Sequence, residues 1–245
     1  MKIIKRIAVA LLLLSLLVLT ASEVVAVKQK KQRVRPLTRA ELKSASLRLK
    51  ELGYTSAGSS RSALVLFQKW EGRKVTGRLS RGDYDVLMNA TAPQPKDPDY
   101  KHVEVDLDRQ LLLLVDEDGA IERMMPVSTG SGKRYNEKGM RGTAYTPRGR
   151  FRVYAKIAGW RKSPLGLLYY PNYFSDGIAI HGNPSVPSTP QSHGCIRIPM
   201  SSAKWMSKQL TIGTIVLVYD SQSFVSAKEW VLEDQRKEAV IQNQR

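Results

Sequence analysis

The chain has 245 residues, 42% of them hydrophobic, and a mean hydropathy of −0.30. This length allows one sizeable domain with a small companion, and the composition is that of an ordinary globular protein apart from its first residues. The formal net charge of +17 would suit a nucleic-acid-binding protein, but no motif for nucleic acid is present. Because the N-terminus predicts export, wall polymers and lipid headgroups are the expected anionic partners, unless the charge serves only solubility.

Residues 1–26 have the layout of a secretory signal peptide. A short basic head, Met1–Arg6, precedes an apolar run, Ile7–Leu19, and Val24–Ala26 ends in a small residue that suits cleavage. The run is shorter than the roughly 20 residues that a membrane span needs. We therefore expect export to the periplasm or cell wall and membrane contact only through this segment; an uncleaved anchor is the alternative.

Residues 38–90 predict a small all-α domain of three helices. A capping box begins the first helix after Thr38, the second begins at Ser59 or Ser60, and the third begins at Ser80.

Three segments of this domain together resemble the peptidoglycan-binding domain. They read LGY at the end of residues 49–54, FQ at the end of residues 63–68 and TGRL at residues 76–79. The resemblance implies an affinity for peptidoglycan glycan. Where that family usually has an acidic residue before the glycine, this chain has Val75 and Thr76, so a helical spacer without a ligand is the alternative.

Two segments beside the helical domain show neither helix nor strand periodicity. Residues 27–37 are basic and of low complexity, which predicts a flexible leader. Residues 91–100 include three prolines within eight residues, and because proline fixes φ and removes a donor, this segment is expected to be a linker.

From residue 101 to 220 the hydrophobic period changes to two, which predicts a mainly β domain. Leu111–Val115 and Ile121–Val127 flank a turn and predict a hairpin, while only Ser201–Leu210 predicts a helix. His102 lies on the polar side of an alternating strand and is expected at a surface or a sheet edge. Residues 221–245 predict an amphipathic helical tail.

The segment richest in reactive side chains contains the only cysteine of the chain, Cys195, and two of its three histidines, His181 and His193. A thiol becomes an effective nucleophile when a neighbouring base takes its proton. Two glycines, Gly182 and Gly194, allow close approach of the backbone, and consecutive amides can stabilise an oxyanion. The alternatives are a zinc site formed by the two histidines and the cysteine, and a buried structural cysteine.

The same segment closely resembles the catalytic motif of the L,D-transpeptidases, in which a His-Gly pair precedes Ser-His-Gly-Cys. The resemblance extends over residues 102–219 and implies a mixed-sheet, β-sandwich-like catalytic domain with a short helix. It also implies residue roles: Cys195 as nucleophile, His181 as general base oriented by the carbonyl of Gly182, His193 lining the site, the amides of Gly194 and Cys195 as oxyanion hole, Arg197 binding a substrate carboxylate or buttressing the loop, and Ser192 fixing the loop. For Arg197 a structural salt bridge is the alternative.

Aromatic residues before this motif supply a further expectation. Tyr169, Tyr170 and Tyr173 are predicted either to wall a groove for the donor or to pack in the core.

The implied reaction needs neither metal nor other cofactor. Cys195 would form a thioester with a tetrapeptide stem and pass it to an amine of another stem or of an envelope protein. The alternatives are water as acceptor, as in an L,D-carboxypeptidase or cross-link hydrolase, a non-catalytic wall-binding protein, and a zinc peptidase.

Overall fold

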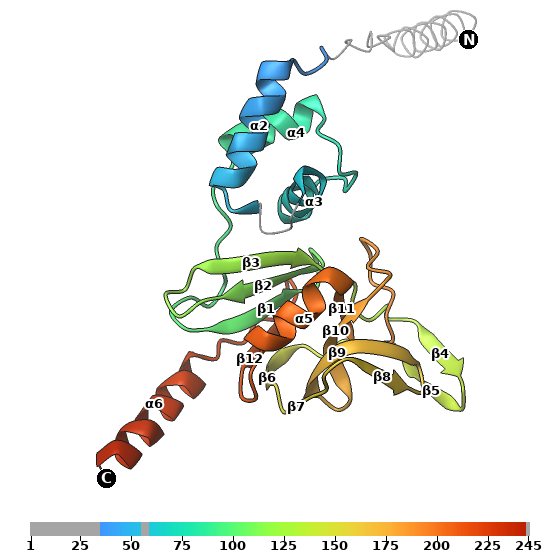
Figure 1. The fold of residues 1–245 in the computed structure, drawn as a ribbon, viewed down its shortest axis with the longest axis vertical. Helices are drawn as coiled ribbons and strands as arrows, with labels where there is room; N and C mark the ends of the chain where they lie inside the picture. Colours follow the sequence, from blue (N-terminus) through green and yellow to red (C-terminus); the bar gives the residue numbers. More distant parts are fainter. Residues whose placement is uncertain (1–34, 55–58, 244–245) are drawn as a thin grey trace, which may run out of the picture. The chain divides into compact units, whose positions relative to one another are not determined.

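The computed structural model describes residues 35–54 and 59–243 (Figure 1). The predicted signal peptide and most of the predicted leader lie outside these residues. Within them, no helix has both the length and the apolar character that a membrane span requires.

Three helices precede the β region, as predicted: α2 (Arg39–Glu51), α3 (Ser60–Trp70) and α4 (Arg81–Asn89). Each begins at a hydroxyl residue whose side chain accepts a hydrogen bond from a backbone amide of the first turn. At α2 and α4 a carboxylate of the first turn also binds the capping residue's own amide, which completes the capping box.

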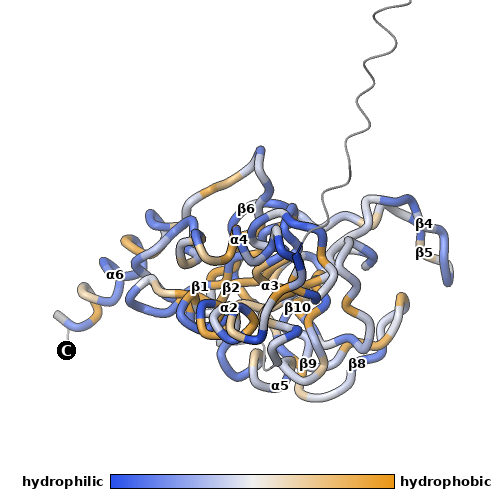
Figure 2. Tube along the Cα trace, turned by 90° about the horizontal axis from the view of Figure 1, so that it is seen from above, coloured by the Kyte–Doolittle hydropathy of each residue, from blue (hydrophilic) through white to orange (hydrophobic). Residues whose placement is uncertain are grey.

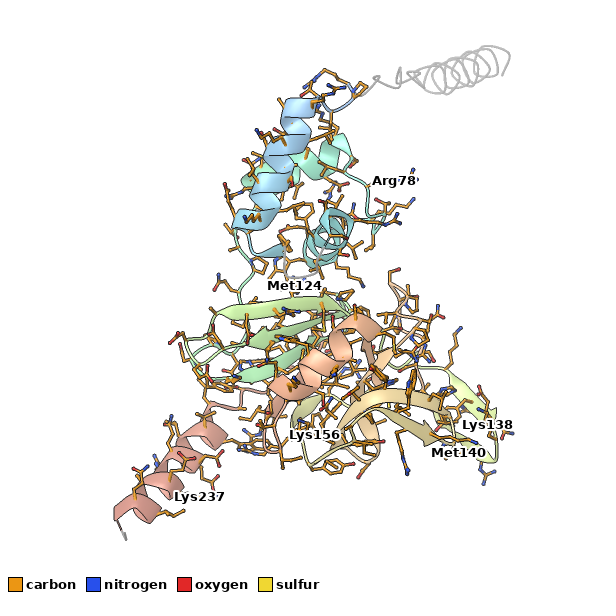
Figure 3. All side chains as sticks on the ribbon, viewed as in Figure 1. Arg78, Met124, Lys138, Met140, Lys156 and Lys237 are labelled. Carbon is orange, nitrogen blue, oxygen red and sulfur yellow. The ribbon has the colours of Figure 1, made fainter. Side chains whose placement is uncertain are left out.

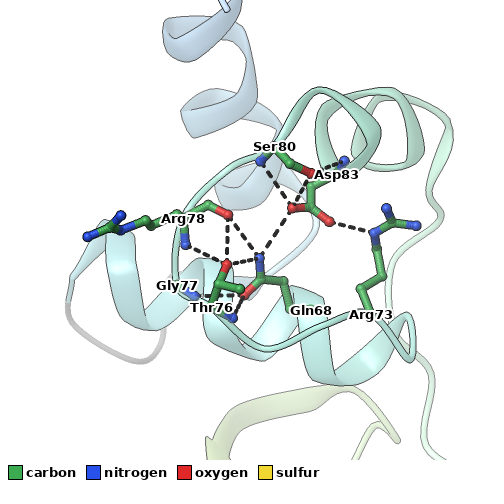
Figure 4. Close-up of polar contacts among 7 residues, drawn as sticks. All are labelled: Gln68, Arg73, Thr76, Gly77, Arg78, Ser80 and Asp83. Atoms are coloured by element: carbon green, nitrogen blue, oxygen red, sulfur yellow. Dashed lines mark hydrogen bonds and ion pairs between the residues drawn. The ribbon is translucent and has the colours of Figure 1, made fainter. Parts of the chain in front are cut away.

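The loop between α3 and α4 is held by buried polar side chains (Figure 4). The Gln68 side chain is fully buried, and its oxygen accepts hydrogen bonds from the amides of Thr76 (2.9 Å) and Gly77 (2.8 Å). Its amide nitrogen lies 3.3 Å from the Asp83 carboxylate, which also pairs with Arg73. Because these buried groups satisfy one another, the loop keeps one conformation without regular secondary structure.

The β region forms two mixed sheets and a separate hairpin. The first sheet has the order β3-β2-β1-β12-β6, with β1 parallel to β12, and the second has the order β11-β10-β9-β7, with β10 parallel to β11 and β8 paired to β9. This confirms the predicted mainly β class with mixed sheets. The strands are β1 (His102–Asp106), β2 (Leu111–Val115), β3 (Ile121–Pro126), β4 (Arg134–Glu137), β5 (Met140–Thr143), β6 (Gly149–Arg152), β7 (Ala155–Lys156), β8 (Trp160–Ser163), β9 (Gly166–Ser175), β10 (Ile178–Asn183), β11 (Ile196–Pro199) and β12 (Ile215–Tyr219).

Strand β2 is buried on both faces, which explains why its sequence is continuously apolar. Leu112 and Leu114 belong to the core shared with β10, β11 and α5 (Met200–Gln209). Leu111 and Leu113 belong to a second core with α3 and the other helices of the N-terminal domain. Hydrophobic residues accordingly concentrate along β1, β2 and α3 (Figure 2). The helical domain thus shares a core with the first sheet, a contact that the sequence did not predict.

The expectation that His102 lies at a surface or a sheet edge is wrong. Strand β1 is central in its sheet, and His102 is fully buried. Its Nδ1 lies 2.8 Å from the carbonyl oxygen of Tyr100, and its Nε2 lies 3.2 Å from Oε1 of Glu104, which is fully buried as well. Tyr219 donates a hydrogen bond of 2.8 Å to the other Glu104 oxygen. Alternating polar residues in β1 therefore form a buried network rather than a solvated face.

The C-terminal tail begins its helix later than predicted, at α6 (Lys228–Asn243). The residues before α6 pack against the predicted linker, where buried Asp97 accepts hydrogen bonds from the Ser226 hydroxyl and the Ala227 amide (2.8 Å). The end of the predicted linker is therefore an ordered part of the β domain, and it covers the face of β1 that carries His102.

Candidate active site

The register of β10 and β11 brings the predicted catalytic side chains to one face. Ile180 pairs with Ile196 and His181 with Arg197 in parallel, and both isoleucines lie in the core. Because successive side chains alternate across a sheet, His181 and Arg197 share the opposite face, and Cys195 lies in the turn directly before β11.

That face forms one wall of a cavity of about 420 Å³. Six of the predicted site residues line it, Tyr173 among them, and two neighbouring hairpins complete it: β8–β9 through residues 161–168, and β4–β5 through Tyr135 and Met140. The structure thus brings together in one cavity His181, Ser192, His193, Cys195 and Arg197.

His181 is held as a neutral base in a buried position. Its side chain is 4% exposed, and Nδ1 lies 3.0 Å from the carbonyl oxygen of Gly182. A carbonyl only accepts hydrogen bonds, so Nδ1 carries the hydrogen and Nε2 is the nitrogen that can take a proton. Burial lowers the pKa of His181 to about 4. The hydrogen bond to Gly182 opposes this shift, and the charge of Arg197 adds to it.

Cys195 is half-buried, and its Sγ lies 3.9 Å from the carbonyl oxygen of Gly177. Burial raises the pKa of the thiol, while a hydrogen bond from the Ala179 amide and the Arg197 charge oppose that rise. Together with the low pKa of His181, this makes a protonated thiol and a neutral imidazole in the same cavity the resting state near pH 7. A thiolate would then form only as the base takes the proton.

The turn that presents Cys195 is fixed by Ser192, which agrees with the predicted loop role. The Ser192 hydroxyl donates a 2.6 Å hydrogen bond to the carbonyl of Cys195 and accepts one of 3.0 Å from the amide of Gly194. The Gly194 amide is therefore engaged within the turn, which contradicts its predicted place in an oxyanion hole. The residue was assigned by resemblance, which cannot reveal that a neighbouring hydroxyl binds the amide. Of the two amides, that of Cys195 remains the candidate.

Steric demands require glycine at both predicted glycine positions. Gly194 has a φ of 142°, and a Cβ there would lie 2.8 Å from the Tyr145 carbonyl oxygen. At Gly182 a Cβ would lie 2.6 Å from that of Ala203 on α5. These glycines therefore allow close packing behind the site.

His193 reaches the β4–β5 hairpin at the rim of the cavity. Its Nε2 lies 3.4 Å from a carboxylate oxygen of Glu137, and its ring stands edge-on to Tyr135 at a centroid distance of 4.9 Å. This hairpin was not predicted from the sequence. Its signal was the two-residue turn Lys138–Gly139, in which both residues have positive φ (50° and 77°).

Of the three tyrosines predicted to wall a groove, only Tyr173 lines the cavity. Tyr169 and Tyr170 pack against the core instead, the alternative that was left open. The reason is an irregular register between β9 and β10, with Tyr170 at a φ of 49°, so that strand alternation does not hold across it. Burial and the neighbouring Cys195 raise the pKa of Tyr173.

Arg197 carries a charge into the cavity without a carboxylate partner within 4 Å in the described part of the chain. Burial lowers its pKa, and Cys195 opposes this. The salt-bridge alternative for Arg197 is therefore wrong. The zinc alternative is also unsupported, because residues 35–54 and 59–243 hold no group of three His, Cys, Asp or Glu side chains arranged for a metal ion.

Comparison with known proteins agrees with this geometry. The family model of the L,D-transpeptidase catalytic domain (YkuD) matches residues 100–218. The solved structure of an L,D-transpeptidase from Xylanimonas cellulosilytica is 36% identical, with a TM-score of 0.63, and the match covers 72% of this chain and 91% of that one.

Two further solved structures are less similar. An L,D-transpeptidase from Stackebrandtia nassauensis is 24% identical (TM-score 0.45, 72% of this chain and 89% of that one), and one from Mycobacterium smegmatis is 23% identical (TM-score 0.41, 49% and 58%). None of the curated proteins matches the chain. The matched domain and the first of these relatives show that this chain belongs to the L,D-transpeptidase family.

Proposed function

We propose that this protein is an exported peptidoglycan L,D-transpeptidase that forms a thioester between Cys195 and a tetrapeptide stem and transfers it to an amine. The observation that carries the proposal is the cavity beside β10 and β11, which is lined by the only cysteine, by a histidine that burial keeps neutral, and by an arginine that has no carboxylate partner among the described residues.

In the first step, Nε2 of His181 takes the thiol proton while Sγ of Cys195 attacks the carbonyl of the third stem residue. The new C–S bond yields an oxyanion, for which the amide of Cys195 is the candidate donor. The C–N bond to the terminal D-alanine then breaks, and the imidazolium returns its proton to the leaving amine. A base with a pKa below neutrality suits this sequence, since it is unprotonated at the start.

In the second step, the acceptor amine attacks the thioester, loses a proton to His181 and expels the Cys195 thiolate, which is reprotonated. Arg197 is suited to bind a stem carboxylate, because its guanidinium has no carboxylate partner in the described residues. The Cys195 carbonyl and the Ser192 hydroxyl keep the turn in place through both steps.

The stem peptides and glycan of peptidoglycan are the proposed partners, and an envelope protein is a second possible source of the amine. The net charge of +17 supports a location among anionic wall polymers. Wall binding by the helical domain stays a prediction.

The acceptor is tested by product analysis. Purified protein is incubated with a disaccharide-tetrapeptide, with and without an amine acceptor peptide, and the products are identified by mass spectrometry. The proposal expects a cross-linked product and free D-alanine when the acceptor is present. A tripeptide product alone, at the same rate with and without the acceptor, would make water the acceptor and contradict transpeptidation.

A further inference from the structure

The C-terminal end of α3 contacts the catalytic domain through a buried lysine. The Lys69 side chain is 5% exposed, and its Nζ donates hydrogen bonds to the carbonyl oxygens of Ser188 (3.0 Å) and Arg109 (3.4 Å). In the opposite direction, Arg109 of the catalytic domain contacts α3. Its Nε donates a 2.9 Å hydrogen bond to the carbonyl of Trp70, and its guanidinium lies over the Trp70 ring at 4.8 Å. The two domains therefore exchange polar contacts in both directions.

Packing alone does not explain a lysine at this position. Burial lowers its pKa to about 8, which shows that the site disfavours the charge. No carboxylate lies within 4 Å of the ammonium group in the described residues, so backbone carbonyls are its only polar partners there. An apolar side chain of similar length would fill the space without this desolvation. The hydrogen bonds to the carbonyls are what the lysine adds.

One of those carbonyls belongs to the loop that leads into the catalytic motif. One residue after Ser188, the carbonyl of Thr189 accepts a 2.8 Å hydrogen bond from the hydroxyl of Ser128, and the same hydroxyl accepts one of 3.1 Å from the amide of Gln191. The Ser192 amide then bonds to the carbonyl of Thr129 (2.8 Å). The loop from Ser188 to Ser192 is thus held at successive residues on its way to Cys195.

The other carbonyl, that of Arg109, is also connected to Ser192. Arg109 precedes Gln110, whose side-chain oxygen accepts a 2.9 Å hydrogen bond from the amide of Thr129 and whose nitrogen donates one of 2.8 Å to the Thr129 hydroxyl. Thr129 in turn holds the Ser192 amide. The two carbonyl groups that Lys69 binds, those of Ser188 and Arg109, are therefore each connected to Ser192 through neighbouring residues and their hydrogen bonds. The hydroxyl of Ser192 in turn holds the turn at Cys195.

We propose that Lys69 is a positioning residue for acylation, through which the helical domain holds the Ser188–Ser192 loop and thereby the turn that presents Cys195. The helical domain would then contribute to the rate of acylation by holding this loop. This inference rests on the proposed function, because it assumes that Cys195 is acylated. Lys69 itself touches neither the cavity nor Cys195, and its effect passes through the loop.

The test compares Lys69→Met with the wild type in the full chain. Single-turnover acylation of Cys195 by a tetrapeptide donor is followed by intact mass across donor concentrations, at a temperature well below the unfolding midpoint of every variant. We expect the maximal acylation rate to fall by about 10-fold, because small displacements of a reacting group have large effects on rate. The half-saturating donor concentration should stay within about 2-fold, since the groups that contact the donor are unchanged.

A matched control is Lys156→Met. Lys156 lies on β7 and donates to the carbonyl of Ser207 on α5, so this change also removes a lysine–carbonyl hydrogen bond, but one that does not involve the Ser188–Ser192 loop (Figure 3). Its maximal acylation rate should equal that of the wild type.

Two results would overturn the inference alone: a wild-type maximal rate in Lys69→Met, or an equal loss in the two methionine variants. If Lys69→Met does not fold, Lys69→Gln replaces it. Its side chain is one bond shorter and cannot reach both carbonyls, so we expect a loss of about 3-fold, and a wild-type rate would overturn the inference. If the wild type itself is not acylated, the proposed function fails and this inference fails with it.

Discussion

Acid should destabilise this protein through His181 in particular. The folded protein holds His181 at a pKa of about 4, against 6.5 for an ordinary histidine. The unfolded chain therefore binds the proton more readily, and acid favours unfolding. The loss of stability begins near pH 6.5, amounts to about 2 kcal/mol between pH 7 and pH 5, and approaches about 3 kcal/mol below pH 4.

The measurement is urea unfolding of the wild type and of His181→Gln at pH 7 and pH 5. Carboxylates such as Glu104, whose pKa is lowered by its hydrogen bonds although burial opposes this, contribute equally to both proteins and cancel in the comparison. The wild type should lose about 2 kcal/mol more free energy of unfolding than the variant. An equal loss in the two proteins would mean that protonation of His181 does not contribute to acid unfolding.

Three substitutions give further predictions. Gly182→Ala should cost about 1–3 kcal/mol of stability, because its Cβ would lie 2.6 Å from that of Ala203; an unchanged unfolding midpoint in urea would contradict this. Glu104→Gln should lower the free energy of unfolding by about 2–4 kcal/mol and loosen the contact with Tyr219, since it weakens a fully buried acceptor; thermal unfolding monitored by circular dichroism checks it. Arg197→Gln should raise the half-saturating donor concentration about 10-fold in acylation assays with less than about 1 kcal/mol change in stability, because the guanidinium has no carboxylate partner in the described residues; a larger effect on stability than on donor binding would disagree.

The sequence predicted those elements whose signals are local. The capping residues of the three helices and the alternating or continuous apolar runs of β1 and β2 depend on neighbours a few positions apart, and the structure confirms them. The β4–β5 hairpin was not predicted, because its strands are short and exposed and its turn, Lys138–Gly139, lacks the usual Asn or Asp.

Long-range packing explains the errors. His102 alternates like a surface residue, but the segment around Asp97 and the start of the tail cover it, and no local pattern predicts that cover. The same holds for Tyr169, because an irregular register between β9 and β10 decides on which face of the sheet its side chain lies. For the candidate site, the motif predicted which side chains meet, whereas the engaged Gly194 amide and the contact of His193 with Glu137 depend on geometry.

The proposed mechanism requires that Cys195 becomes acylated, and intact-mass analysis of the protein incubated with a tetrapeptide donor detects this step. The wild type should gain the mass of the donor less D-alanine, hydroxylamine should remove this adduct, and Cys195→Ala should gain nothing. A wild type without an adduct, or an adduct of the same mass on Cys195→Ala, would contradict it.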